Sequence, residues 1–476
     1  MRWRQRLLRL LPWHRRLALL ACLGVFTWAA SGMLHPLMSA LQPRPAQFVA
    51  PRPALPLEHL RAPAQVLATA GVPAVAGLRL LVLDGQPYYQ VRLVGQSEPR
   101  YWHARTGAPA DLAARHAESL AAHYLGEDAN LRYRGSLTSF SSEYAFINRL
   151  LPAARVDTAR DDGLRLYVDL YQDRLGTLVD DRKAWFSLLF QQLHSFAWLQ
   201  HAGTWRVVLM LVLLASVALT ALLGMALFIA RKRAPTRLRR VHGWGGMLLA
   251  LVSLSFLASG TWHLLHKRAA PAPLVDYAAQ LSTAKLVGAP APDWLPPGDS
   301  LYRLHLVELD GEPTWRLETD RTLFYRTAGG EPLPGEAAQR YLQQRFAYYA
   351  AQRGLGQPQE IQLQERFDHE YGFIFKRLPV LKASYDDADN SALFLDPVDG
   401  ALAARVSNAD RLEGAIFAYL HKWELLNHLG KVSKDLLLSL SALSLLLLAC
   451  TGLWLHARRP RRTASNTLNA PQGETP

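Results

Sequence analysis

The chain has 476 residues, of which 50% are hydrophobic, 19% charged and 10% aromatic, and it contains two cysteines. This composition excludes a disordered chain, a collagen and a small disulfide-stabilised scaffold. The formal net charge of +14 is concentrated in three short basic patches beside long apolar runs, and elsewhere basic and acidic residues nearly balance. Such a distribution is typical of membrane topology and argues against a nucleic-acid partner.

Four apolar stretches are long enough to cross a bilayer, which takes about 20 residues of helix. We expect transmembrane helices at 17–41, 205–230, 241–265 and 436–455. The basic patches precede the first stretch, separate the second from the third and follow the fourth, and such positively charged segments stay in the cytoplasm. The sequence therefore places 1–16, 231–240 and 456–476 inside, and 42–204 and 266–435 outside. A cleaved signal peptide is the alternative interpretation of the first stretch.

Each external segment has the pattern of a small α+β domain. In the first we expect a helix at 57–70, a hairpin of 78–83 and 88–94 around Asp84-Gly85, a strand at 101–104, a helix at 111–125 and a strand at 164–170. In the second we expect strands at 302–309, 314–318, 323–325 and 392–395 and a helix at 336–351. The proline-rich stretches 42–56 and 290–297 are typical of linkers.

Motifs recur along the chain at an almost constant offset. His14, Ser31-Gly32 and His35 are matched 228 residues later by His242, Ser259-Gly260 and His263. Further matches at nearly the same offset are Leu83-Asp84-Gly85 with Leu309-Asp310-Gly311, Glu143-Tyr144 with Glu370-Tyr371, Leu193-His194 with Leu420-His421, and His201 with His428. We interpret the chain as a tandem duplication, in which each half reads span, external domain, histidine-bearing segment, span.

Eight histidines occupy matched positions at or near these spans. His14 and His35 are 21 residues apart, or about 31 Å along a helix, and leave roughly the same side of it. His194 and His201 are spaced by seven, which predicts one helical stripe leading into the second span, with His194 about two turns further out. The second half repeats both spacings.

Ionisable residues at membrane depth are costly and usually functional. The plain alternative is a histidine in the headgroup layer beside a tryptophan such as Trp13 or Trp262. Because all eight rings recur in both halves, we favour ligation. Zinc commonly takes mixed ligands with cysteine or carboxylate, whereas haem iron held by two imidazoles suits paired histidines in a four-helix bundle. No Cys-x-x-Cys-His is present, so the haem would be non-covalent and b-type.

Two b-type haems follow from the histidine placement. We expect one between His14 and His242, and another between His35 or His263 and His201 or His428. His194, His421 and His456 are secondary candidates for iron ligation. Nearby small residues (Gly24, Ser31, Gly32, Ser259 and Gly260) would let a flat macrocycle approach the backbone, or they are ordinary helix-packing residues.

The chain resembles the PepSY-associated transmembrane family. The motifs that carry the resemblance are Trp13-His14, Val241-His242-Gly243-Trp244, Leu193-His194-Ser195-Phe196, Leu420-His421-Lys422-Trp423, Asp368-His369-Glu370-Tyr371 and Arg377-Leu378-Pro379-Val380. The resemblance implies two periplasmic PepSY-like domains on a bacterial inner-membrane protein with both termini in the cytoplasm. Some members resemble siderophore reductases with two b haems. The first half has Ser141-Ser142 where the second has Asp368-His369, so a substrate-facing role of that segment would be confined to one half.

We therefore expect a haem-dependent oxidoreductase that passes electrons across the membrane to a periplasmic ferric siderophore or similar acceptor and so releases iron. Its electrons would come from quinol or a donor protein, because the sequence shows no flavin or nicotinamide motif. The alternative is a non-enzymatic PepSY membrane protein that binds or restrains periplasmic proteases or assists envelope assembly. A transporter is a further alternative, which the lack of broken helices disfavours.

Overall fold

The computed structural model describes residues 2–127, 130–231, 235–269 and 273–458. The expected inside segments 231–240 and 456–476 lie partly outside the described residues. The chain divides into two compact units. The helical unit comprises 1–37, 189–265 and 417–476, and the sheet unit comprises 38–188 and 266–416.

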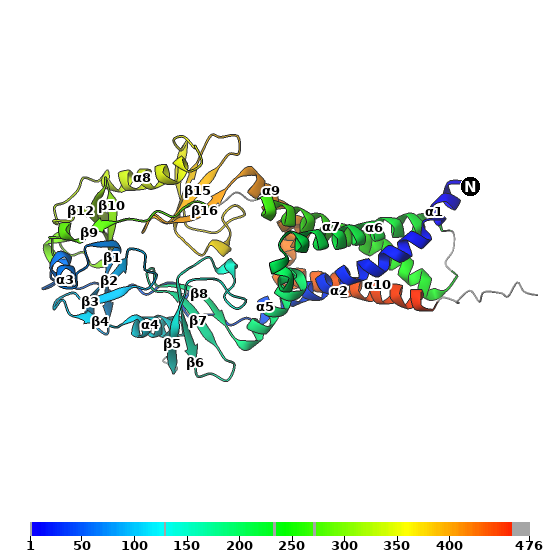
Figure 1. The fold of residues 1–476 in the computed structure, drawn as a ribbon, viewed down its shortest axis with the longest axis horizontal. Coiled ribbons are helices and arrows are strands. Elements are labelled where there is room, and N and C mark those ends of the chain that lie inside the picture. The colour runs from blue at the N-terminus through cyan, green and yellow to red at the C-terminus, as the bar shows by residue number, and fades with distance from the viewer. Residues whose placement is uncertain (1, 128–129, 232–234, 270–272, 459–476) are drawn as a thin grey trace, which may run out of the picture. The chain divides into compact units, whose positions relative to one another are not determined.

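Four long helices make up most of the helical unit (Figure 1): α2 (Leu11–Leu41), α6 (Thr204–Ala230), α7 (Arg237–Ala269) and α10 (Lys431–Ala457). A short helix, α1 (Arg2–Leu8), precedes them. Each of the four is long and apolar enough to cross a membrane. Many of their large apolar side chains are exposed, among them Leu222, Leu251 and Leu447. Exposure of this kind is unfavourable in water but not against lipid tails, so the fold is that of a membrane protein.

The predicted hairpin around Asp84-Gly85 is confirmed. Strands β1 (Ala74–Leu83) and β2 (Gln86–Leu93) pair antiparallel across it. Asp84 and Gly85 have φ angles of 50° and 74°, the left-handed pair that a tight hairpin turn requires. Asp310-Gly311 makes the same turn between β10 (Leu301–Leu309) and β11 (Glu312–Thr319).

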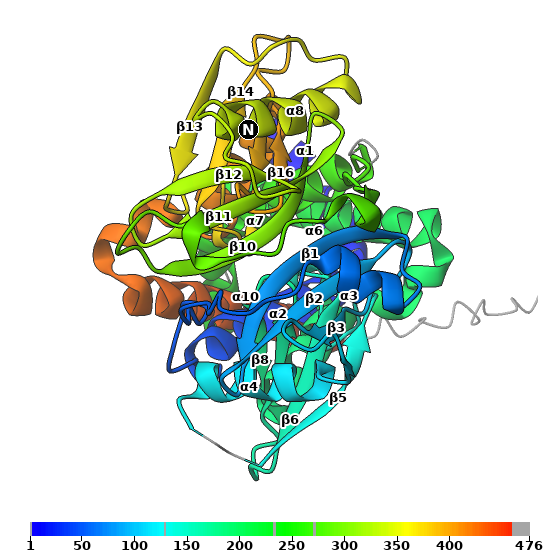
Figure 2. The same ribbon diagram turned by 90° about the vertical axis from the view of Figure 1, so that its left-hand side faces the viewer.

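Strands from both external segments form one antiparallel sheet. Its order is β12-β11-β10-β1-β2-β3-β4, and β9 pairs with β1. The remaining strands of this sheet are β3 (Arg100–His103), β4 (Pro109–Ala110), β9 (Leu281–Ser282) and β12 (Leu323–Thr327). Figure 2 shows β1 beside β10, where Leu78 lies opposite Leu306. The two segments therefore do not form separate sheets here, although the sequence suggested two separate domains.

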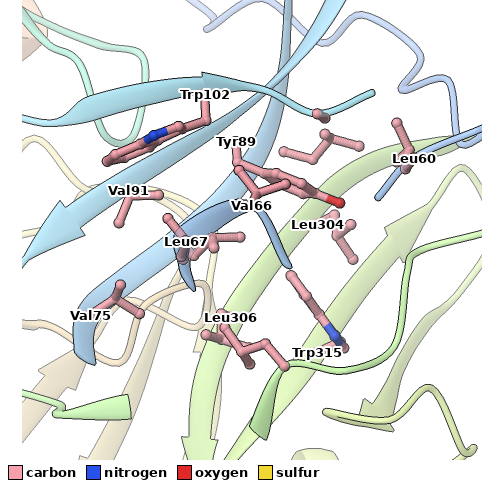
Figure 3. Packing of buried hydrophobic residues seen from close by; sticks show 14 of the residues in the cluster. Leu60, Val66, Leu67, Val75, Tyr89, Val91, Trp102, Leu304, Leu306 and Trp315 are labelled. Carbon is pink, nitrogen blue, oxygen red and sulfur yellow. The ribbon is translucent and has the colours of Figure 1, made fainter. Parts of the chain in front are cut away.

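The main core lies against this sheet, and its middle is aromatic. Tyr89, Leu304 and Trp315 are fully buried beside Trp102 (Figure 3). Helix α3 (Pro63–Thr69) contributes further apolar side chains. The helix expected at 57–70 is shorter because it begins at Pro63, whose fixed φ and missing N–H suit a first helical turn.

Two further sheets of four antiparallel strands complete the sheet unit. One contains β5 (Leu131–Leu137), β6 (Ala153–Thr158), β7 (Arg165–Asp169) and β8 (Arg174–Val179). The other contains β13 (Glu360–Gln364), β14 (Val380–Ser384), β15 (Ala392–Leu395) and β16 (Leu402–Val406). The predicted helices at 111–125 and 336–351 are confirmed as α4 (Ala113–Leu125) and α8 (Ala337–Ala351). Helix α9 (Asn408–Ile416) ends this part of the chain.

A buried ion cluster connects the two segments within the sheet unit. The carboxylate of Asp396 is 0% exposed and lies 2.7 Å from Arg174 and 3.1 Å from Arg377. Burial by itself would raise the pKa of Asp396, but the two guanidinium charges outweigh it and hold the pKa at about 2. Since Arg174 comes from the first segment and Asp396 from the second, this cluster stabilises their association.

Replacement Asp396→Asn should reduce the free energy of unfolding of the sheet unit by about 3–5 kcal/mol, because it leaves two buried cations without their counter-charge. In the unaltered protein this contribution should be constant at neutral pH and fall away only as the pH drops from about 4 through 2. Thermal and acid unfolding in detergent measures both effects. Glu312→Gln, which removes an exposed partner of Lys285, is the matched control and should cost less than about 1 kcal/mol. An equal loss in both variants would contradict the assignment.

Candidate functional site

Four histidines gather in the helical unit and are named here the four-histidine cluster: His35, His194, His263 and His421. His35 lies on α2 and His263 on α7. His194 is the last residue of α5 (Asp181–His194), and His421 is the last residue of the short π-helical turn η6 (Phe417–His421). The ring centres of His194 and His421 are 6.2 Å apart, and their planes are nearly perpendicular.

Each of these two central rings is held by a buried serine. Nδ1 of His194 lies 2.9 Å from the hydroxyl of Ser31, and Nδ1 of His421 lies 2.9 Å from the hydroxyl of Ser259. Both serine residues are almost completely buried. The two contacts are equivalent in partners and distance, although they come from opposite halves of the chain.

The serine contacts also fix which ring nitrogen carries the proton. Ser31 donates its hydroxyl proton to the carbonyl of Trp28, and Ser259 donates its own to Phe256. A hydroxyl has a single proton, so its oxygen accepts a hydrogen bond from the histidine Nδ1–H. Burial lowers the pKa of His194 to about 3 and that of His421 to about 4, so both rings are neutral. Nε2 of each ring therefore keeps its lone pair, the form in which imidazole binds a metal.

Aromatic side chains fill the space beside the four rings. Phe190 stacks on His194 at 4.6 Å and also lies 6.0 Å from His35, between ring centres. Phe417 stacks on His421 at 4.7 Å and on His263 at 5.4 Å. These contacts surround the cluster with apolar rings and limit the orientations that the imidazoles can adopt.

The backbone after each central histidine reverses direction. Phe196 follows α5 with a left-handed φ of 51°, and the chain then makes a short turn, η2 (Ala197–Ala202), before α6. Trp423 does the same after His421 with a φ of 52°, and η7 (Glu424–Leu429) precedes α10. The predicted single helical stripe through His194 and His201 is therefore wrong. His194 and His421 lie against α2 and α7, not two turns beyond them.

The structure does not bring His201 or His428 to the cluster. Both are exposed, and among the described residues their polar contacts are local: His201 with Gln200, and His428 with the carbonyl of Leu425. The expected pairing of these rings with His35 or His263 is thus replaced by His194 and His421, the secondary candidates. His456 is half-buried on α10 and makes no polar contact with any described residue.

His14 and His242 form a second site, named here the histidine pair, and lie within electrostatic range of each other. Nδ1 of His14 lies 3.1 Å from the carbonyl oxygen of Thr220, and Nδ1 of His242 lies 3.1 Å from the hydroxyl of Thr451. Each ring also lies against a glycine of the next helix in the chain. A Cβ on Gly224 would come 3.3 Å from His14, and one on Gly452 would come 3.2 Å from His242. The two glycines thus make room for the rings.

The donor set suits haem iron better than a bare metal ion. No three His, Cys, Asp or Glu side chains of the described residues are grouped as ligands of a metal ion. The 6.2 Å between the ring centres of His194 and His421 is close to the roughly 6 Å that two imidazoles on opposite sides of one iron require. The neutral rings and their free Nε2 atoms fit the same ligand.

Sequence reasoning missed the residues that hold these rings. Ser31 and Ser259 were assigned only a packing role, and Phe190, Phe417, Gly224 and Gly452 were not singled out. The available signal was the spacing Phe-x-x-x-His, which occurs as Phe190 to His194 and again as Phe417 to His421. One helical turn separates such residues, so their side chains meet.

Comparison with known proteins agrees with this class of fold. The four apolar helices and the sheet unit define a multi-pass membrane protein with a large non-membrane part. Residues 315–474 match the family model described as the PepSY-associated TM region, which confirms the predicted family over these residues. The match includes His421, His428 and His456. No curated protein matches the chain.

The tautomer assignment predicts a specific nuclear magnetic resonance signature. In haem-free protein labelled with ¹⁵N-histidine, His194 and His421 should be protonated at Nδ1 and not at Nε2. Ser31→Ala should alter the signal of His194, and Ser259→Ala that of His421, with a loss of about 1–3 kcal/mol in unfolding free energy because a buried N–H loses its acceptor. Ser216→Ala, at a buried serine whose hydroxyl bonds only Leu213, should leave both signals unchanged. Protonation at Nε2 in the unaltered protein would refute the assignment.

Proposed function

We propose that this protein is a b-haem oxidoreductase of the bacterial inner membrane that delivers electrons to a periplasmic ferric chelate such as a siderophore complex. The observation that carries the proposal is the four-histidine cluster, in which serines hold two neutral imidazoles with Nε2 free. A non-enzymatic membrane anchor has no need of this arrangement. The proposed orientation, with the sheet unit in the periplasm and both termini in the cytoplasm, rests on the three basic patches.

We further propose that the chain arose by tandem duplication and holds two haems. The support is the equivalence of contacts in the two halves: Ser31 with His194 resembles Ser259 with His421, and Gly224 with His14 resembles Gly452 with His242. His194 and His421 are the proposed ligands at the four-histidine cluster, and His14 and His242 at the histidine pair. His35 and His263 would flank the first of these sites.

Bound haem would supply one-electron redox chemistry at each site. The chain itself positions the ring nitrogens, excludes water with Phe190 and Phe417, and keeps the imidazoles neutral by burial. Reduction at the external side would release iron because ferric ion is held by hard oxygen ligands that bind ferrous ion far more weakly. Quinol or an electron-donor protein is the proposed source of electrons.

Counting haem per chain tests the ligand assignment. Protein purified in detergent from haem-replete cells should be red, with a Soret band that sharpens on reduction by dithionite. His194→Ala and His421→Ala should each remove about one haem of two, and His14→Ala and His242→Ala should remove the other. His201→Ala and His428→Ala are matched controls and should retain both. A colourless preparation would overturn the proposal and favour the non-enzymatic alternative, and loss of haem in the controls would overturn the ligand assignment.

The glycines at the histidine pair provide a separate test. Gly224→Ala or Gly452→Ala should crowd the adjacent ring, because the new Cβ would lie 3.3 or 3.2 Å from it. We expect the occupancy of that haem alone to fall several-fold, by about 10- to 100-fold in affinity at most. Gly246→Ala is the control, since its Cβ would meet only Leu448 at 4.0 Å. Absorption spectra before and after addition of haem give the occupancy, and unaltered occupancy in both variants would contradict the packing argument.

A further inference from the structure

Two short turns, one from each external segment, meet within the sheet unit. They are η1 (Phe146–Asn148) and η5 (Phe373–Phe375), which contact each other. The guanidinium of Arg149 lies 4.4 Å above the ring of Phe146 and 5.2 Å from the ring of Phe375 in the other turn. Arg149 thus connects the two turns through their aromatic faces.

Each turn is followed by a cationic residue with an unusual backbone. Arg149 has a φ of 62° and Lys376 a φ of 65°. Such left-handed values are uncommon for residues other than glycine, asparagine and aspartate. The same strain at positions 227 residues apart indicates that the surrounding fold retains these two cations at a cost, as binding sites often do.

A third cation joins them from the first turn of α5. The ammonium of Lys183 donates to the hydroxyl of Thr177 and to the carbonyl of Leu178. Burial, and next the nearby charge of Lys376, lower the pKa of Lys183 to about 8. Asp180 acts in the opposite direction, but it accepts the backbone N–H of Lys183 and lies beside Arg182.

None of the three cations forms an ion pair with a described carboxylate. Most other charged side chains of the sheet unit do, as Arg165 with Glu143 and Lys382 with Glu370 show. Partly buried cations that repel one another gain most from an external anion. Beside them Phe146 is 61% exposed, although aromatic rings usually pack inside.

From this geometry we infer a binding site for a compact polyanion that carries aromatic rings, formed by Arg149, Lys183 and Lys376 with Phe146 as its apolar wall. The polyanion would neutralise the three charges, and its rings would stack on Phe146 and on the guanidinium plane. A metal tris-catecholate has this chemistry. Identification of the ligand as the electron acceptor rests on the proposed function, whereas binding itself does not.

A lipid surface would be recognised differently. Lysine and arginine side chains that contact headgroups extend toward water from an exposed face. Here Lys183 and Lys376 are half-buried, and Arg149 is stacked between two aromatic rings. The arrangement favours a small ligand that enters between the turns.

The probe is the gallium(III) tris-catecholate complex, which has the shape and charge of the ferric complex but is not reduced. Its binding to the full-length chain in zwitterionic nanodiscs should be saturable and should weaken with added salt. Arg149→Asn, Lys376→Asn and Lys183→Gln should each weaken binding by about tenfold, since each removes one charge-assisted contact. Asparagine tolerates the left-handed backbone, so the first two variants should keep their fold. Lys285→Gln, at an exposed lysine paired with Glu312, is the control and should bind normally.

The outcomes separate this inference from the proposed function. His194→Ala should bind the gallium complex with unchanged affinity, and Arg149→Asn should keep its haem spectrum. Equal affinity of the unaltered chain and the three charge variants would overturn the site. Loss of binding in nanodiscs that contain anionic phosphatidylglycerol would show a lipid contact instead and would also overturn it. Normal binding by a chain without haem would leave the site intact and refute only its role in electron transfer.

Discussion

A hydrogen bond between a serine hydroxyl and an imidazole, present once on each side of the helical unit, determines how the rest of this site is organised. Ser31 and Ser259 each give their only proton to a backbone carbonyl, so the ring that contacts them must donate. The serines therefore anchor the ends of α5 and η6 to two apolar helices, and they select the histidine tautomer at the same time. Position and proton placement are consequences of one contact, and the stacked rings of Phe190 and Phe417 only restrict the remaining rotation.

Much of the fold could be predicted because its signals are local. The hairpins follow from Asp-Gly turns, and the four long helices follow from composition. The location of His194 and His421 could not be predicted in the same way. It depends on left-handed backbone at Phe196 and Trp423, aromatic residues that rarely adopt it, so the spacing pointed to one continuous helix. The pairing of β1 with β10 was also invisible, because edge-to-edge contacts between distant strands leave no periodic pattern in the sequence.

The two halves agree where they contact the histidines and differ where they carry charge. In the shared sheet Arg79 lies opposite His305, so a buried cation faces a neutral ring at the offset position. Arg79 binds Asp173 through two hydrogen bonds, and His305 instead packs against Tyr171. Lys183 has Asp410 as its counterpart 227 residues later, and Asp410 binds His266. The sheet unit is thus electrostatically asymmetric, which allows a ligand to occupy one orientation even though the turns that meet there are alike.

The position of β1 in the middle of the large sheet constrains the order of biosynthesis. Its partner β10 begins at Leu301, and helices α6 and α7 lie between the two strands in the sequence. One edge of β1 therefore stays open on the nascent chain until both apolar helices have been made. An open, apolar strand edge can pair with the wrong neighbour, and the long closure slows correct docking. The amino-terminal half should consequently depend on chaperone protection during this interval, and expression of that half alone should give an aggregating product.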